Sequence, residues 1–159
     1  MEKLCLVLWR ERELLETLLY RLEVEQLVLA SNRTQHLMRA AKDVEAVLET
    51  LRSTEVLRAT AASEAAQDVG CPPDASLRQL ADAAEEPWGT ILREHRDAFA
   101  AITRQVTALA DSNRDLLTSG YRQAQEALAT LGESTDSYNH DGRAMTATPS
   151  VARLFDGSL

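Results

Sequence analysis

Residues 87–131, PWGTILREHRDAFAAITRQVTALADSNRDLLTSGYRQAQEALATL, decide how this chain folds. Pro87 suits the first position of a helix, because its missing N–H would have no intrahelical partner there. Apolar residues then recur three and four positions apart: Leu92, Phe99, Ile102, Val106, Leu109 and Leu116. His95 and Asn113 occupy positions in the same series. This spacing predicts one helix of about 65 Å with a single apolar stripe. Such a stripe needs partner helices, from this chain or from another.

The stripe changes register just after Asn113. A second apolar run then begins, as if four residues stood where three were expected; it comprises Leu117, Tyr121, Ala124, Leu128 and Leu131. An irregularity of this kind locally unwinds a coiled coil. The sequence leaves two interpretations open. Asn113 is either a tolerated polar residue or register device, or a residue that shapes a local interaction surface.

Composition limits both the fold class and the partners. The length of 159 residues suggests one domain. Hydrophobic residues make up 45% of the chain but aromatic residues only 4%, a mixture that favours helices packed through aliphatic side chains over a sheet core. The net charge of −8 repels nucleic acid and anionic membranes, so neither is expected as a primary partner.

The N-terminus and the two cysteines indicate a cytoplasmic protein. The apolar run over residues 4–9 ends at Arg10, so it is too short for a signal-peptide core and for a membrane span. Cys5 and Cys71 lie far apart and show no metal-ligand spacing. We therefore expect two free thiols in a reducing compartment.

Three further helices are predicted before Pro87. Residues 3–30 and 33–68 carry apolar side chains at heptad spacing, and residues 76–84 form a short helix with Ser76 as its candidate cap. Together with 87–131 they predict an all-α fold, an elongated antiparallel helical bundle or coiled coil.

Two interruptions separate these helices. Ser31-Asn32 is a tight turn, a kink or a polar patch in one continuous helix, and either residue is a candidate N-cap for the next helix. Gly70-Cys71-Pro72-Pro73-Asp74 is a firm break.

The end of the chain differs in character from the rest. Gly132 is expected to end the long helix, which sets a helical domain at 1–132 and a flexible C-terminal tail at 133–159. Within the tail, residues 150–156 form a short apolar segment whose one face would carry Val151, Leu154 and Phe155. This trio is either a docking peptide or a loose end.

The sequence offers no catalytic chemistry. Di-metal sites in helical bundles need Glu-x-x-His pairs, and none of the three histidines has a carboxylate three residues before it. No glycine-rich phosphate loop and no nucleophile elbow occurs. We expect no metal, no cofactor and no enzymatic activity, and we interpret His95 as a core or boundary side chain. Trp9 and Trp88 are packing residues or interface anchors.

Several short segments together carry a family resemblance. They are Leu14-Leu15-Glu16 with Leu18-Leu19, Leu29-Ala30-Ser31, Asp111-Ser112-Asn113-Arg114-Asp115-Leu116-Leu117, and Ser137-Tyr138-Asn139-His140-Asp141-Gly142. With these segments the chain resembles the FlgN family of flagellar export chaperones over nearly its whole length. The Asn-x-x-Leu-Leu core and the Tyr-x-x-x-Gly tail match best.

The resemblance implies a small cytoplasmic helical chaperone that works without ATP. Its clients would be secreted hook-associated proteins of the FlgK and FlgL type, whose terminal helices it would hold and deliver to the type III export gate. The resemblance and the second apolar run place client binding on seven residues: Asn113, Leu116, Leu117, Tyr121, Ala124, Leu128 and Leu131. Tyr138 would dock on the export gate.

Two other classes of protein stay open from the sequence. The first is a non-catalytic coiled-coil adaptor or scaffold that self-associates into a homo-oligomer through its apolar stripe. The second is a metal-dependent bundle enzyme, which bound-metal analysis would detect.

Overall fold

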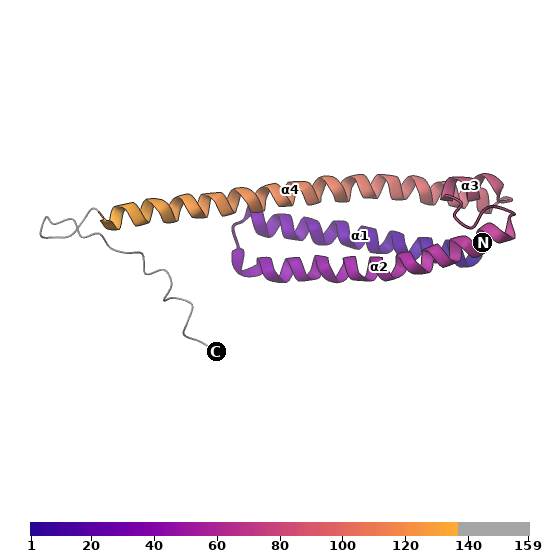
Figure 1. Ribbon diagram of the computed structural model, residues 1–159, viewed down its shortest axis with the longest axis horizontal. Helices are drawn as coiled ribbons and strands as arrows, with labels where there is room; N and C mark the ends of the chain where they lie inside the picture. The colour runs from indigo at the N-terminus through magenta and orange to yellow at the C-terminus, as the bar shows by residue number, and fades with distance from the viewer. Residues whose placement is uncertain (137–159) are drawn as a thin grey trace, which may run out of the picture. The chain divides into compact units, whose positions relative to one another are not determined.

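The computed structural model describes residues 1–136, with side chains described over residues 1–131. This part of the chain is all-α and contains no strand, which confirms the predicted fold class. The helices are α1 (Glu2–Ala30), a short 3-10 helix η1 (Thr34–His36), α2 (Leu37–Asp68), α3 (Leu77–Ala83) and α4 (Trp88–Asp136) (Figure 1). The predicted flexible tail lies outside the described residues, apart from residues 133–136.

The contacts that the chain makes with itself divide it into two compact units. The first, Met1–Leu117, holds α1, η1, α2, α3 and the first part of α4. The second, Thr118–Leu159, holds the rest of α4.

In the first unit, α1 and α2 run antiparallel. Lys3, near the start of α1, forms an ion pair of 2.7 Å with Glu64, near the end of α2. Arg21, further along α1, pairs at 3.5 Å with Asp43, near the start of α2. Because these pairs are largely exposed, they mark the direction of the helices more than they stabilise them.

The first part of α4 runs parallel to α1. The edge of the Trp9 ring meets the His95 ring at 5.0 Å between centroids, and Gln26 donates a hydrogen bond of 3.0 Å to Ser112. In both contacts the α4 residue lies 86 positions after its α1 partner. In this register the last residue of α1, Ala30, corresponds to Leu116. The contact surface that α1 offers to α4 therefore ends near Leu116.

The interruption between the first two helices is a true turn. Asn32 adopts a left-handed conformation with φ of 53°. The backbone N–H of Asn32 donates to Leu29 O at 3.1 Å, and that of Arg33 donates to Val28 O at 3.2 Å. These bonds form a Schellman motif that ends α1. Neither Ser31 nor Asn32 caps the next helix, so that prediction was wrong: both residues close the helix before it.

Helix α2 also ends in a Schellman motif, and α3 begins with a side-chain N-cap. Gly70, at φ of 72°, follows the last turn of α2, and the N–H of Cys71 donates to Ala66 O at 2.8 Å. Ser76 caps α3 as predicted, because its hydroxyl accepts from the N–H of Gln79 while the Gln79 side chain accepts from the N–H of Ser76.

Two predicted bounds of the long helix need correction. Helix α4 begins at Trp88, one residue after Pro87, and it continues through Gly132 to Asp136. A glycine inside a helix costs only about 1 kcal/mol relative to alanine, so a single glycine does not force an end.

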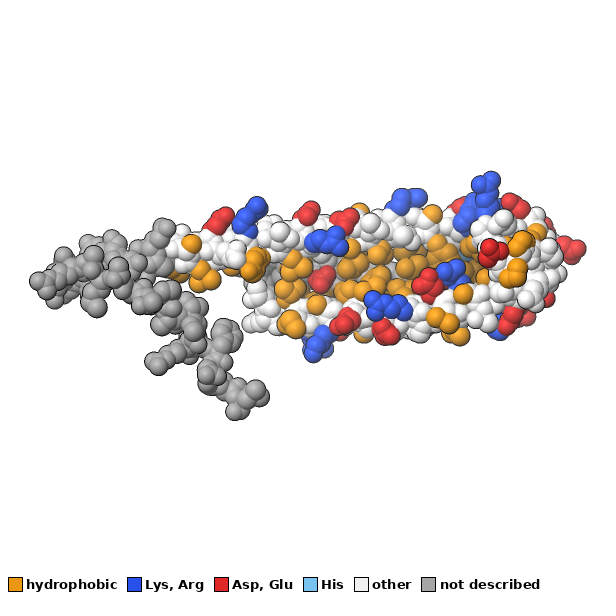
Figure 2. Space-filling model, in the orientation of Figure 1, with side chains coloured by type: hydrophobic (Ala, Val, Ile, Leu, Met, Phe, Trp, Pro, Cys, Tyr) orange, Lys and Arg blue, Asp and Glu red, His pale blue; other side chains and the backbone are white. Residues whose placement is uncertain are grey.

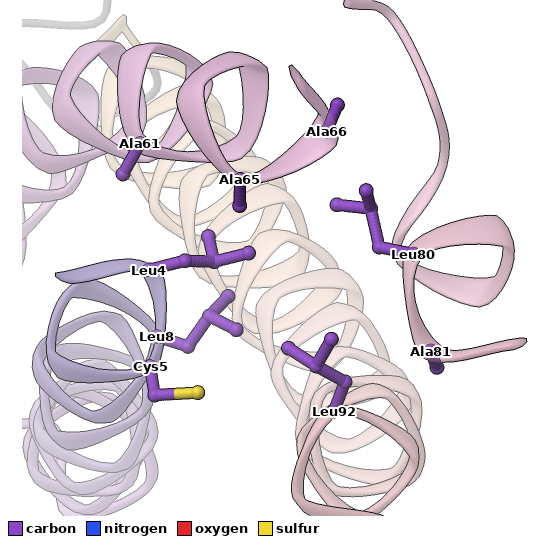
Figure 3. Close-up of a cluster of buried hydrophobic side chains, with 9 residues drawn as sticks. All are labelled: Leu4, Cys5, Leu8, Ala61, Ala65, Ala66, Leu80, Ala81 and Leu92. Atoms are coloured by element: carbon purple, nitrogen blue, oxygen red, sulfur yellow. The ribbon is translucent and has the colours of Figure 1, made fainter. Parts of the chain in front are cut away.

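The core of the first unit lies where all four α-helices meet. Figure 3 shows its side chains converging from α1, α2, α3 and α4. They are Leu4, Cys5, Leu8, Ala61, Ala65, Ala66, Leu80, Ala81 and Leu92. The alanines of α2 and α3 are short, so the leucines of α1, α3 and α4 supply most of the buried apolar area. This core fixes the start of α4 against α1.

Candidate protein-binding surface

The second unit presents an apolar helix face to solvent. Tyr121, Ala124, Leu128 and Leu131 are all exposed on α4, and Leu128 is 69% exposed. Their spacing of three and four residues places them along one side of the helix, which we call the α4 face. Figure 2 shows apolar side chains at the surface of this part of α4. The α4 face is a candidate site for a partner helix.

The α4 face is also uncharged. Between Thr118 and Leu131 the charged residues are Arg122 and Glu126. At 100° per residue, both fall on the opposite side of α4 from Leu128. The Tyr121 hydroxyl accepts a hydrogen bond of 2.9 Å from Gln125. This bond satisfies the one polar group of the α4 face within the same helix. A partner helix can therefore bury apolar side chains there without burying a charge of α4.

The part of α4 that belongs to the first unit ends with two partly exposed leucines. Leu116 is 37% exposed and Leu117 is 43% exposed. Their exposure begins where the contact surface of α1 ends. In sequence, Leu117 precedes Tyr121 by four residues and continues the same heptad series.

Asn113 differs from the other six predicted client-binding residues. It is only 3% exposed, and its Nδ2 donates to the carbonyl oxygen of Leu22 at 3.0 Å and to Glu25 Oε2 at 2.9 Å. The side chain thus joins α4 to α1 in the interior of the first unit, and it does not line an exposed surface. This placement agrees with the interpretation of Asn113 as a register device.

Replacing Asn113 with Asp is expected to lower the free energy of unfolding by about 2 kcal/mol at pH 7. The new carboxylate would face only acceptors, the Leu22 carbonyl and the Glu25 carboxylate. Urea unfolding followed by circular dichroism measures the loss. Adding Glu25→Gln should recover part of it, because the new amide can donate. An unchanged midpoint for Asn113→Asp would mean that these hydrogen bonds do not hold α4.

The first unit has a separate apolar hollow that the sequence did not single out. Figure 2 shows an apolar band between the edge formed by α4 and the edge formed by α2. The first unit also holds a hollow of about 280 Å³, lined by Leu8, Glu11, Leu15, Arg58, Leu77, Phe99 and Thr103. Glu11 and Arg58 form an ion pair of 3.0 Å there, and burial raises the pKa of Glu11 even though Arg58 opposes this. The sequence signal that could have predicted this hollow is the presence of three long helices with apolar stripes and no fourth long helix to cover those stripes.

His95 is a core side chain, as predicted. It is 3% exposed between the edge of Trp9 and the stacked ring of Phe99, and neither ring nitrogen has a hydrogen-bond partner among the described residues. Burial lowers the pKa of His95, and the positive charge of Arg12 lowers it further, while Glu94 opposes the shift. The buried ring is therefore neutral at pH 7.

This burial predicts a stability that depends on pH. The unfolded chain binds a proton at His95 near the ordinary pKa of 6.5, and the folded chain does so only at lower pH. Between these two pKa values the unfolded state binds more protons, so the free energy of unfolding falls as the pH drops below about 6.5. Urea unfolding from pH 8 to pH 5 measures the fall. In His95→Leu the fall should be smaller, and an equal fall in both proteins would contradict the assignment.

The other predicted site residues lie outside the described residues. These are Tyr138 and the trio Val151, Leu154 and Phe155. Trp9, one of the two candidate anchors, is 54% exposed with the Arg12 guanidinium 5.6 Å from its ring, while Trp88 is half-buried.

Comparison with known protein families matches residues 1–146 to the family described as FlgN protein. The chain belongs to the FlgN family. The match covers all four α-helices, including the whole of α4. Neither the comparison with curated proteins nor that with solved structures gave a match.

Family membership gives the chain a general role as a flagellar export chaperone. FlgN proteins are chaperones and are generally not enzymes. Among the described residues, no helix is long and apolar enough to cross a membrane.

Proposed function

We propose that this FlgN-family chain binds the terminal helices of a hook-associated client of the FlgK or FlgL type in the cytoplasm. The client helix would lie along the α4 face of the second unit. We also propose Leu116 and Leu117, the last two residues of the first unit, as client-binding residues. The observation that carries the proposal is the exposed, uncharged α4 face itself. Asn113 would act from the interior, as a residue that positions α4 on α1.

The physical basis is the packing of an amphipathic helix on an apolar surface. Full burial of a leucine contributes about 1.5–3 kcal/mol, and the α4 face offers two leucines and a tyrosine. A client helix also buries its own longer apolar stripe in the contact, and after the cost of association this combined burial supports micromolar to nanomolar binding. The client would keep its own apolar stripe covered until export. We further propose that Tyr138 serves in delivery to the export gate.

The experiment is a calorimetric titration of the full chain with a purified client of the FlgK or FlgL type. We expect a dissociation constant in the micromolar range or below, and loss of the binding heat when the client lacks its terminal helices. Equal binding of the complete and shortened clients would rule out the terminal helices as the ligand. A chain that binds no client and sediments as a homo-oligomer would instead support the adaptor alternative.

A further inference from the structure

The second unit contains two apolar elements that suit one another. One is the α4 face, whose side chains are exposed. The other is the trio Val151, Leu154 and Phe155, in the same unit of the chain. We propose that the segment 150–156 packs on the α4 face and competes there with the client. The competition rests on the proposed function, whereas the packing of the segment on α4 does not.

The chain is long enough for this contact. Fourteen residues, 137–150, separate the end of α4 from Val151. Fourteen residues reach at most about 46 Å. The α4 face begins at Leu131 and ends at Tyr121, about 8 to 22 Å from Asp136 along the helix. The connecting chain therefore spans the required distance at every position of the face.

The chemistry of the two elements is complementary. Val151, Leu154 and Phe155 are spaced i, i+3 and i+4, so one helical turn would present all three side chains together. Arg153 and Asp156 would then face away from the contact and keep their hydration. On α4, Gly120 has no side chain, and apart from its chain neighbours and the nearby backbone of α4 no atom lies within 4 Å of where a Cβ would be. No side chain at position 120 therefore obstructs a phenylalanine ring beside Tyr121 and Ala124.

The expected strength makes the segment a competitor that a client can displace. Three apolar side chains on an open helix face give a weak contact, with a dissociation constant on the order of millimolar. A short connecting chain supplies an effective concentration that is also on the order of millimolar. The docked and undocked forms are then similarly populated. Removing the segment's apolar residues should therefore raise the affinity for a client by about twofold.

The first test compares NMR spectra of the full chain and of the double variant Leu154→Asp, Phe155→Asp. We expect chemical-shift changes at Tyr121, Ala124 and Leu128. The matched control is Arg153→Gln with Asp156→Asn, which changes the opposite side of the same segment and should leave these signals in place. Unchanged α4 signals in the apolar-to-Asp variant would overturn the proposal. Changes that appear only with rising protein concentration would also overturn it, because they would identify a second copy as the occupant.

The second test measures client affinity for the same proteins by calorimetry. The Leu154→Asp, Phe155→Asp variant should bind the FlgK- or FlgL-type client about twice as tightly as the unmodified chain. Equal or weaker binding would overturn the competition. If the client binds none of the proteins while the NMR difference persists, the proposed function fails and the packing of the segment on α4 stands.

Discussion

Replacing Leu128 with Asp is expected to weaken client binding by at least about thirtyfold while leaving the helical content of the chain unchanged. Leu128 is 69% exposed, so its replacement removes little packing from the free protein. In the complex, the same side chain would lie beneath the client helix. Its loss removes about 1.5–3 kcal/mol of apolar burial, and the introduced carboxylate would also be desolvated without a partner. Calorimetric titration with the FlgK- or FlgL-type client measures the change.

The control for this variant is Thr130→Asp, which introduces the same charge two residues further along α4. At 100° per residue, Thr130 points away from the α4 face. Its hydroxyl donates to the Glu126 carbonyl, a local bond whose loss does not affect a contact on the other side. We expect less than a threefold change in client affinity. If Leu128→Asp and Thr130→Asp weakened binding equally, the effect would come from net charge and the α4 face would not be the site.

The helices were predictable because their signals are local. A spacing of three and four residues sets the face of a helix, and this spacing runs through most of the three long helices. Ser76 with Gln79 three residues later is likewise a capping signal within one turn. Helix ends were less predictable. Asn32 and Gly132 carry similar stop signals, yet Asn32 closes α1 and Gly132 lies inside α4.

Exposure was not predictable from the stripe alone. Leu92 and Leu128 both belong to heptad series of α4, but Leu92 is fully buried and Leu128 is largely exposed. Leu92 lies in the core of the first unit, where side chains of α1, α2 and α3 pack around it. Which side chains cover a given position depends on contacts between segments far apart in sequence, such as that of Gln26 with Ser112, and these form only in the folded chain.

Asn113 shows the same limit for a polar residue. Its position in the stripe marked it as unusual, and both a structural and a binding role fitted that position. The observation that favours the structural role is the pair of hydrogen bonds to Leu22 and Glu25, which lie about ninety residues earlier in the chain. A single sequence does not state which carbonyl of another helix will face the amide. The client-binding surface proposed from the structure is therefore narrower than the one proposed from the sequence.

Replacing Leu92 with Ala is expected to destabilise the chain by about 2–5 kcal/mol, in the upper part of that range. Leu92 is 0% exposed, and its neighbours in the core include Ala61, Ala65, Ala66 and Ala81. These alanines have no rotatable length with which to fill the cavity, so little relaxation can offset the loss.

Urea unfolding followed by circular dichroism measures this loss, with Leu128→Ala as the matched control. The same truncation at an exposed position of the same helix should change the free energy of unfolding by less than about 0.5 kcal/mol. Similar effects at Leu92 and Leu128 would mean that α4 is not anchored through the core. The α4 face depends on that anchor, because a helix can leave one stretch exposed for a partner only if another stretch holds it firmly in the fold.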